Sequence, residues 1–341
     1  MAETRRIQVD RESPEPSAIA EAAAVLAAGG LIAFPTETVY GLGADATRSE
    51  AVAKIYQAKG RPPANPLIVH VSGVSRAKEV VTTWPETAER LATRFWPGPL
   101  TLVLPRSPRI VDAVSAGLPT VGVRVPDCRV ALALLARFGV PVAAPSANRS
   151  ASVSPTRAEH VLKDLDGAID LVLDAGPAPV GIESTVLDLS AETPVLLRPG
   201  AITAGQIEAV LGRPVRVPPR LDGSAELTSP GQLPVHYAPR TPLVLVEPDQ
   251  LGSDTWRPGQ KVALLAFDRE PTAELPDATI RYYWADPASA GRWLYETFHQ
   301  CDDDRLDLIV AVVPPDIDEW RAVRDRLWRA SRRWAREGLG D

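Results

Sequence analysis

Short apolar segments alternate with helical segments along the first 212 residues, and this alternation limits the folds open to the chain. Several connections between apolar segments are too short for a helical crossover, so an α/β domain with a mixed, twisted sheet is expected. The predicted strands are 31–34, 67–71, 100–104, 121–125, 140–144, 171–174, 184–189 and 195–198. The predicted helices are 17–28, 49–58, 85–95, 129–138, 157–165 and 204–211, and 35–43 is expected to be a loop.

The pattern breaks after residue 212. Residues 213–240 are rich in Pro and Gly and show no periodicity, which predicts an extended linker or lid. Strands predicted at 242–246, 262–267, 280–284 and 308–313 then alternate with helices at 289–299 and 317–336. Residues 1–212 and 241–341 are therefore expected to form two domains, the second a smaller, Rossmann-like α/β domain.

Composition excludes several classes of protein. The chain has 341 residues and a formal net charge of -6, so a polyanion must be bound by a local basic patch. No apolar run reaches the roughly 18–20 residues of a membrane span, and the N-terminus lacks the apolar core of a signal peptide. A cytoplasmic protein is expected. Cys128 and Cys301 lie far apart and the histidines are scattered, so neither a disulfide framework nor a metal site is predicted.

The sequence KGRPPANPL, which begins at Lys59, combines two cations with three prolines that exclude a helix. Arg61 offers paired donors to phosphate oxygens and Lys59 offers a point charge, so a rigid loop that binds a polyphosphate is predicted. The small polar residues Ser146 and Asn148 of APSAN are expected to complete it. A solvated basic loop is the alternative.

Polar residues also follow several other apolar segments. Thr36 and Thr38 follow the first predicted strand, Arg124 lies inside VGVRVP, Ser184 lies in GIEST, and Arg198 ends another strand. Side chains at strand ends often share a cleft, and a buried arginine needs an anion. The two threonines could instead satisfy turn amides, and Arg124 could pair with an internal Asp or Glu.

Other nucleotide and nucleic-acid motifs are weak. GLGADA fits a dinucleotide fingerprint, but the acidic residue expected about 20 residues later is missing, and no P-loop occurs. The arginines and tryptophans of 317–336 indicate an amphipathic helix with a packed aromatic face and solvated arginines. Contact with tRNA is the alternative for that helix.

The segments PTETVYGLG, KGRPPANPL, FWPGPLTLVL, VGVRVP, APSAN, GIESTVLDL and LRPGAI, in this order, resemble the threonylcarbamoyl-AMP synthase family. SPG and HYAP in the linker are similar to the long form, which has a YrdC-like domain and a C-terminal domain. The resemblance implies that L-threonine, bicarbonate and ATP, accompanied by Mg²⁺, give threonylcarbamoyl-AMP and pyrophosphate. Downstream threonylcarbamoyl transferase proteins would then use this adenylate to modify tRNA.

The resemblance also implies which residues form the site. Lys59, Arg61, Ser146 and Asn148 would line the catalytic cleft. Threonine would be bound by Thr38, His70, Arg124, Ala144 and Ser184, and ATP by Arg61, Asn65, Thr120, Ser146, Ser154 and Arg198. His236 and Tyr237 would belong to the lid, where QLPV replaces the basic residues that the family often carries. A non-catalytic RNA-binding module and a carbamoyl-transfer enzyme that uses another amino acid remain alternatives.

Overall fold

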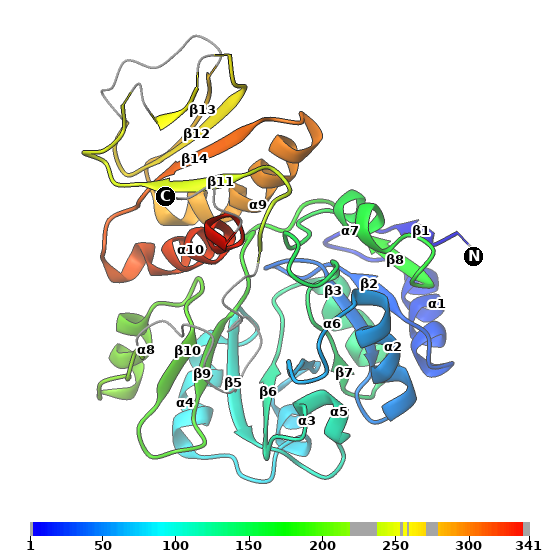
Figure 1. Cartoon of the computed structure of the whole chain (residues 1–341). Coiled ribbons are helices and arrows are strands. Elements are labelled where there is room, and N and C mark those ends of the chain that lie inside the picture. Colours follow the sequence, from blue (N-terminus) through cyan, green and yellow to red (C-terminus); the bar gives the residue numbers. More distant parts are fainter. Residues whose placement is uncertain (1–2, 219–236, 253–254, 258, 271–278, 337–341) are drawn as a thin grey trace. The chain divides into compact units, whose positions relative to one another are not determined.

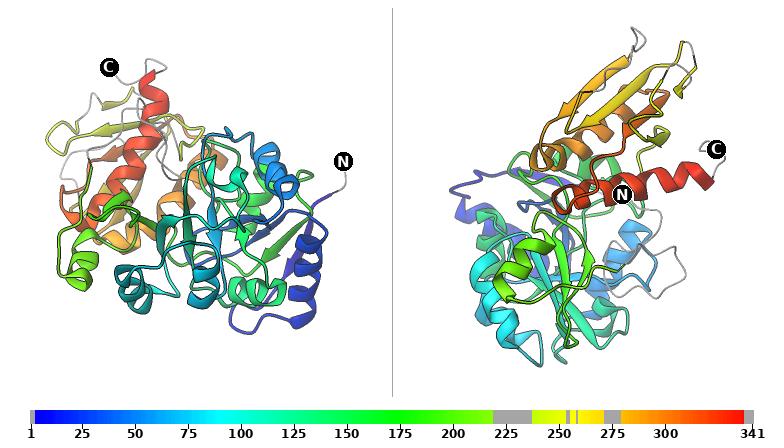
Figure 2. Two further views of the ribbon diagram at one scale, coloured as in Figure 1. Left: turned by 90° about the horizontal axis from the view of Figure 1, so that it is seen from below. Right: turned by 90° about the vertical axis from the view of Figure 1, so that its left-hand side faces the viewer.

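The computed structural model describes residues 3–218, 237–252, 255–257, 259–270 and 279–336 (Figures 1 and 2). Contacts between Cα atoms divide the chain into two compact units. The first contains residues 1–150 and 154–232, and the second contains residues 151–153 and 233–341.

A ten-stranded mixed sheet crosses the first unit from β10 to β1, in the order β1-β8-β2-β3-β7-β4-β6-β5-β9-β10 (Figure 1). Parallel pairs such as β4–β6 and β5–β9 are mixed with antiparallel pairs such as β5–β6, which confirms the mixed sheet predicted from the sequence. Its strands are β1 (Arg5–Gln8), β2 (Ile32–Phe34), β3 (Gly41–Asp45), β4 (Ile68–His70), β5 (Leu100–Pro105), β6 (Thr120–Arg124), β7 (Val142–Ala143), β8 (Leu171–Asp174), β9 (Thr185–Asp188) and β10 (Val195–Arg198).

The helices of this unit end where the sequence provides stop signals. Gly60 and Gly139 take left-handed conformations, with φ of 58° and 72°, directly after α2 and α6. The helices are α1 (Pro16–Ala27), α2 (Ser49–Lys59), α3 (Val74–Glu79), α4 (Glu86–Phe95), α5 (Asp112–Ser115), α6 (Arg129–Phe138), α7 (Ala158–Leu165) and α8 (Ala204–Leu211). Lys59 is thus the last residue of α2, and placing it on the following loop was wrong.

The two faces of the sheet are covered differently. On one face, strand residues such as Val69 and Val123 form a large core with apolar residues of α2, α4, α7 and α8. On the other face, Phe34 and its neighbours on β2, β7 and β8 pack against α1 and α6. Farther along this second face, β4, β5 and β9 contribute only a small cluster of Ile68, Val103 and Val186, to which no described helix adds an apolar residue. We call this stretch, which no described helix covers with apolar side chains although Ile68, Val103 and Val186 are buried, the open face.

The predicted loop at 35–43 was wrong in part, because Gly41–Asp45 forms β3 between β2 and β7. A Cβ at Gly43 would lie 2.9 Å from the ring of Phe34 and 3.0 Å from Val142. The glycines of GLGAD therefore make room for an aromatic ring on the neighbouring strand. Strand β1 and the short helices α3 and α5 were not predicted.

The second unit contains a parallel sheet in the order β11-β14-β12-β13, as the predicted Rossmann-like domain requires. Its elements are β11 (Leu243–Val246), β12 (Val262–Phe267), β13 (Thr279–Trp284), α9 (Pro287–Asp303), β14 (Leu308–Val312), the 3-10 turn η2 (Asp318–Trp320) and α10 (Arg321–Arg336). Arg326 and Arg329 of α10 are buried and pair with Asp325 at 2.9 Å and 3.0 Å. The prediction that the arginines of this helix are solvated was wrong for these two.

Among the described residues, no helix combines the length and the apolar character that crossing a membrane requires.

Candidate active site

His70 and Arg124 end two neighbouring parallel strands. Strand β4 pairs with β6 so that His70 lies beside Arg124. Side chains alternate between the faces of a strand, so Thr120, Gly122 and Arg124 of β6 share one face. Ile68 of β4 lines a hollow on that face together with Thr120 and Gly122, which identifies it as the open face of the sheet. His70 and Arg124 therefore lie at one end of the open face.

Buried Arg124 has three protein partners. Its Nη2 pairs with Glu37 Oε1 at 2.6 Å, its Nη1 donates to Thr38 Oγ1 at 3.0 Å, and its Nε donates to the Gly98 carbonyl at 3.2 Å. The internal acid that the sequence left open is thus Glu37. A guanidinium carries five N–H groups, and the close contact between Nη2 and Glu37 lacks hydrogen-bond geometry, so one N–H of Nη1 and both of Nη2 have no hydrogen-bond acceptor among the described residues. They can bind a ligand carboxylate.

The two threonines of PTET have different partners. Thr36 Oγ1 accepts from the amides of Thr38 and Val39, both at 3.2 Å, and donates to the Val39 carbonyl at 2.6 Å. Thr36 therefore satisfies the turn, as the alternative interpretation predicted. Thr38 Oγ1 lies 2.8 Å from Thr36 Oγ1 and accepts from Arg124, so Thr38 belongs to the site end.

His70 is neutral at physiological pH. Burial, and next the charge of Arg124, lower the pKa of its imidazole to about 3. Phe34 lies edge-on to the ring, with 6.2 Å between centroids, and Nδ1 has no hydrogen-bond partner in the part of the chain that the structure describes. His70 can therefore form a hydrogen bond with a ligand through Nδ1. Its low pKa makes it a poor general base.

Ser184 and Arg198 join this same end of the sheet. Arg198 donates through Nη2 to Ser184 Oγ and through Nε to the Ser184 carbonyl, both at 3.0 Å. Thr101 Oγ1 lies 2.8 Å from Ser184 Oγ. Ser154 donates to Glu183 Oε1 at 2.5 Å, which places it beside the residue before Ser184. The structure thus groups two residues predicted for ATP, Ser154 and Arg198, with residues predicted for threonine.

A second group of predicted site residues lies at the opposite end of this face, where β4 and β6 begin. Lys59 Nζ donates to the main-chain carbonyls of Ser146, at 2.5 Å, and of Asn148. Burial, and next the charge of Arg61, hold the pKa of Lys59 well below its usual range. The predicted contact between KGR and SAN is therefore present. Lys59 makes it, and its partners are main-chain oxygens of SAN instead of side chains.

Arg61 holds its own loop in shape. Its Nε donates to the Asn65 carbonyl at 3.1 Å and its Nη2 to the Pro66 carbonyl at 2.7 Å. The side-chain amide of Asn65 is fully buried, and neither of its polar atoms has a hydrogen-bond partner among the described residues. A buried amide with no partner destabilises the fold by about 1–3 kcal/mol, so an orphaned one suggests that a ligand binds there.

Thr120 and Gly122 connect the two groups. The hollow beside Thr120 also includes Pro66 and Ser115, and its volume of about 10 Å³ suits a single water molecule. The hollow is therefore too small to hold a nucleotide. Thr120 and Arg124 are four strand steps apart, roughly 13 Å. Ala144 follows β7, and its amide donates to the Ile68 carbonyl at 2.9 Å, beside the same face.

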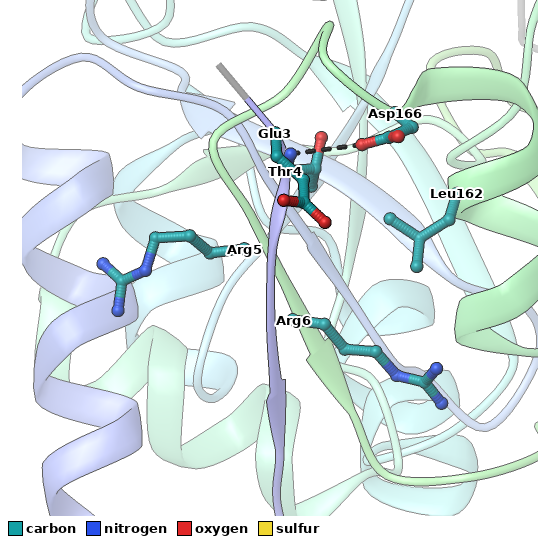
Figure 3. A pocket seen from close by; sticks show the side chains of 6 residues that line it. All are labelled: Glu3, Thr4, Arg5, Arg6, Leu162 and Asp166. Carbon is teal, nitrogen blue, oxygen red and sulfur yellow. Dashed lines mark hydrogen bonds between the residues drawn. The ribbon is translucent and has the colours of Figure 1, made fainter.

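A larger cavity of about 420 Å³ lies beside edge strand β1 (Figure 3). Several of its polar groups have partners in the protein: Asp166 accepts from the Thr4 amide at 3.1 Å, and Arg6 pairs with Asp174 at 2.5 Å. No predicted site residue lines it. Strand β1 is an edge strand of the sheet, and β8, β2, β3 and β7 separate it from β4.

The sequence predicted two residues of a lid, His236 and Tyr237. His236 lies outside the described residues, and Tyr237 packs within the second unit, with the Arg326 guanidinium 5.1 Å from its ring centroid. Within the described part of the chain, no three His, Cys, Asp or Glu side chains gather closely enough to hold a metal ion.

The sequence interpretation gave no specific role to Glu37, Thr101 or Glu183, each of which contacts a predicted site residue in the structure. Glu37 stands between the two threonines of PTET, and Glu183 stands directly before Ser184. A carboxylate next to predicted site residues, in a protein with a predicted buried arginine, was the signal available. Thr101 is the only polar residue of β5, in the segment LTLVLP.

Comparison with known proteins assigns the family. Residues 24–200 match the Sua5, YciO and YrdC family profile, described as telomere recombination, and residues 202–332 match the profile described as threonylcarbamoyl-AMP synthase, C-terminal domain. The threonylcarbamoyl-AMP synthase of Bacillus subtilis is 44% identical, over 94% of this chain and 95% of that protein. The enzyme of the same name from Schizosaccharomyces pombe is 35% identical, over 88% of this chain and 84% of that protein.

Solved structures agree with this assignment. The crystal structure of Pyrococcus abyssi Sua5 complexed with L-threonine superimposes with a TM-score of 0.88 at 39% identity, covering 96% of this chain and 98% of that one. Both the large mixed sheet and the parallel second unit therefore have a counterpart in a solved relative. The chain belongs to the threonylcarbamoyl-AMP synthase family.

Proposed function

We propose that this chain condenses L-threonine, bicarbonate and ATP to threonylcarbamoyl-AMP, pyrophosphate and water. The names of relatives matched along nearly their whole length support this, as does the threonine complex of the Pyrococcus abyssi protein. One geometric observation carries the proposal. The open face of β6 has Arg124 at one end, Thr120 at the other, and Gly122, which has no side chain, between them.

In the proposed reaction, the threonine amine captures carbon dioxide derived from bicarbonate and gives a carbamate. A carbamate oxygen then attacks the α-phosphorus of ATP, and the bond from that phosphorus to the leaving pyrophosphate breaks. No covalent enzyme intermediate is needed, so the protein contributes positioning and charge stabilisation.

At the Arg124 end, the N–H groups of Arg124 that have no acceptor among the described residues would hold the threonine carboxylate. Thr38, His70, Ala144 and Ser184 would surround the rest of the amino acid. Hydrogen bonds from a guanidinium to a carboxylate are charge-assisted, and they are strong in a buried position.

At the other end, Asn65 and Thr120 would bind the nucleotide, and Lys59 and Arg61 would offset phosphate charge. Ser154 and Arg198 lie by the threonine group, so any contact with ATP would be with the part that reacts. The phosphates of ATP bring Mg²⁺, which would offset charge as pyrophosphate leaves.

The burial of the cations argues against an RNA-binding module. Lys59 and Arg61 are 3% and 6% exposed, and both donate to main-chain carbonyls. Contacts to a nucleic-acid backbone come from side chains that the polymer can reach from solvent.

We also propose that the product passes to threonylcarbamoyl transferase proteins that modify tRNA, and that the segment of His236 and Tyr237 closes over the adenylate. Direct contact between this chain and tRNA would be detected as salt-sensitive binding of tRNA.

The test is pyrophosphate release from ATP and bicarbonate, run with threonine, serine or no amino acid, with the adenylate detected by mass spectrometry. We expect release that depends on threonine and a product of the mass of threonylcarbamoyl-AMP. Equal release with serine would support a different amino-acid substrate. No release, together with salt-sensitive binding of tRNA, would support the RNA-binding alternative.

A further inference from the structure

Thr101 is a buried hydroxyl residue on the open face of the sheet. The methyl group of Thr101 lies 3.1 Å from the position that a Cβ on Gly122 would occupy. The hydroxyl group lies 2.8 Å from Ser184 Oγ and has no other hydrogen-bond partner among the described residues. A β-branched side chain has restricted rotamers, so the hydroxyl is held toward Ser184.

The hydrogens around Ser184 Oγ can be arranged in two ways. Arg198 Nη2 can only donate, so Ser184 Oγ accepts from it at 3.0 Å. If Ser184 donated to Thr101, the hydroxyl hydrogen of Thr101 would stay buried without an acceptor. If Thr101 donates, Ser184 Oγ accepts two hydrogen bonds and its own hydrogen is available to a ligand. The second arrangement leaves no buried donor unsatisfied once a ligand supplies an oxygen.

We propose that Thr101 is a positioning residue, which turns the Ser184 hydroxyl hydrogen toward an oxygen of the bound amino acid. This inference rests on the proposed function, because it takes threonine as the ligand at Ser184. Arg198 and Thr101 both donate to the same oxygen, and such donation strengthens the hydrogen bond that Ser184 gives in turn. Thr101 thereby acts on the amino acid through Ser184.

The test uses Thr101→Val, which replaces the hydroxyl by a methyl group. We expect the KM and the calorimetric Kd for threonine to rise about five- to tenfold, the worth of one hydrogen bond, while the KM for ATP stays within about twofold. Thr101→Ser keeps the hydroxyl and should restore threonine affinity. In the double variant with Ser184→Ala, Thr101→Val should add nothing to the loss that Ser184→Ala alone causes.

Thr185→Val is the matched control. Thr185 is also a buried threonine, next to Ser184, but its hydroxyl donates to the Ile202 carbonyl at 2.7 Å. This variant should lower thermal stability without changing the KM for threonine.

Several results would overturn the inference. They are wild-type threonine affinity in Thr101→Val, no recovery in Thr101→Ser, losses that multiply in the double variant, or an equal rise in the KM for ATP. If the wild-type chain makes the adenylate and any one of these results is found, the inference about Thr101 fails and the proposed function stands. A wild-type chain that binds threonine without making the adenylate refutes the proposed function, and the Kd series still decides the role of Thr101. A wild-type chain that does neither refutes both.

Discussion

Gly122→Ala should separate catalysis from folding. The added methyl group would lie 3.1 Å from Thr101 Cγ2, 3.5 Å from Ile68 Cγ1 and 3.9 Å from Val103 Cγ2. Only the first contact is tight, and a shift of a few tenths of an ångström relieves it. Mild overpacking costs about 1 kcal/mol, and replacing glycine where φ is ordinary recovers about 0.4–1 kcal/mol through the unfolded chain. The free energy of unfolding should therefore change by about 1 kcal/mol or less.

The effect on the reaction should be much larger. The methyl group would project from β6 midway between Thr120 and Arg124, where the proposed reaction brings the carbamate and the α-phosphate together. A misplacement of about 1 Å between reacting groups can cost on the order of a hundredfold in rate. We expect kcat/KM for threonine-dependent pyrophosphate release to fall by roughly that factor.

The assay is steady-state pyrophosphate release, with urea unfolding of the same samples. Gly73→Ala is the control, because a Cβ at Gly73 would meet no atom within 4 Å and Gly73 lies outside the site. If Gly122→Ala keeps kcat/KM within about threefold of the wild type while it folds normally, the substrates do not meet over this face.

Four other variants test the two ends of the site. Asn65→Leu removes the orphaned buried amide, so it should stabilise the apo protein by about 1 kcal/mol in urea unfolding and raise the KM for ATP. Phosphate charge should raise the lowered pKa of Lys59, so calorimetry in two buffers should show greater proton uptake on ATP binding by the wild type than by Lys59→Met. The pKa of His70 is about 3 in the folded state and 6.5 in the unfolded state, so the folded protein binds fewer protons between these values and loses stability as pH falls. Unfolding at pH 7.5 and pH 5 should show a loss of about 2 kcal/mol from this source in the wild type and none of it in His70→Asn. Glu37→Gln leaves the Arg124 charge buried without its partner, so it should cost about 3 kcal/mol, and threonine should raise its Tm more than that of the wild type.

The regular elements were accessible from the sequence because their signals are local. Helix α6 and strand β8 match their predicted bounds, since apolar periodicity and a terminal glycine suffice to define such elements. Strand β3 was missed because Gly41 and Gly43 weaken a strand pattern, and the ring of Phe34 that requires them belongs to another segment. Strand β1 was missed because its RRIQ sequence is mostly exposed and lacks alternation.

The members of the site were easier to predict than their partners. Polar residues at strand ends indicated Arg124, Ser184 and Arg198 without any knowledge of the sheet order, and the family resemblance indicated His70. The pairing of Arg124 with Glu37 joins residues far apart in the chain, and it depends on how the sheet order brings the segment between β2 and β3 to the end of β6. A single sequence carries no local signal for such a contact.

The site residues share a property that follows from their task. Asn65 has an unsatisfied amide, the buried Nδ1 of His70 has no hydrogen-bond partner among the described residues, and Lys59 has a lowered pKa, so each destabilises the empty protein. Helices α1 and α6 cover one half of this sheet face, and the other half carries polar groups where apolar residues would be more stable. A ligand that satisfies these groups binds the folded chain alone, so ATP and threonine should stabilise the fold in proportion to the logarithm of their concentration above Kd. The open half of the sheet is therefore a place where folding leaves hydrogen bonds unmade until both substrates supply them.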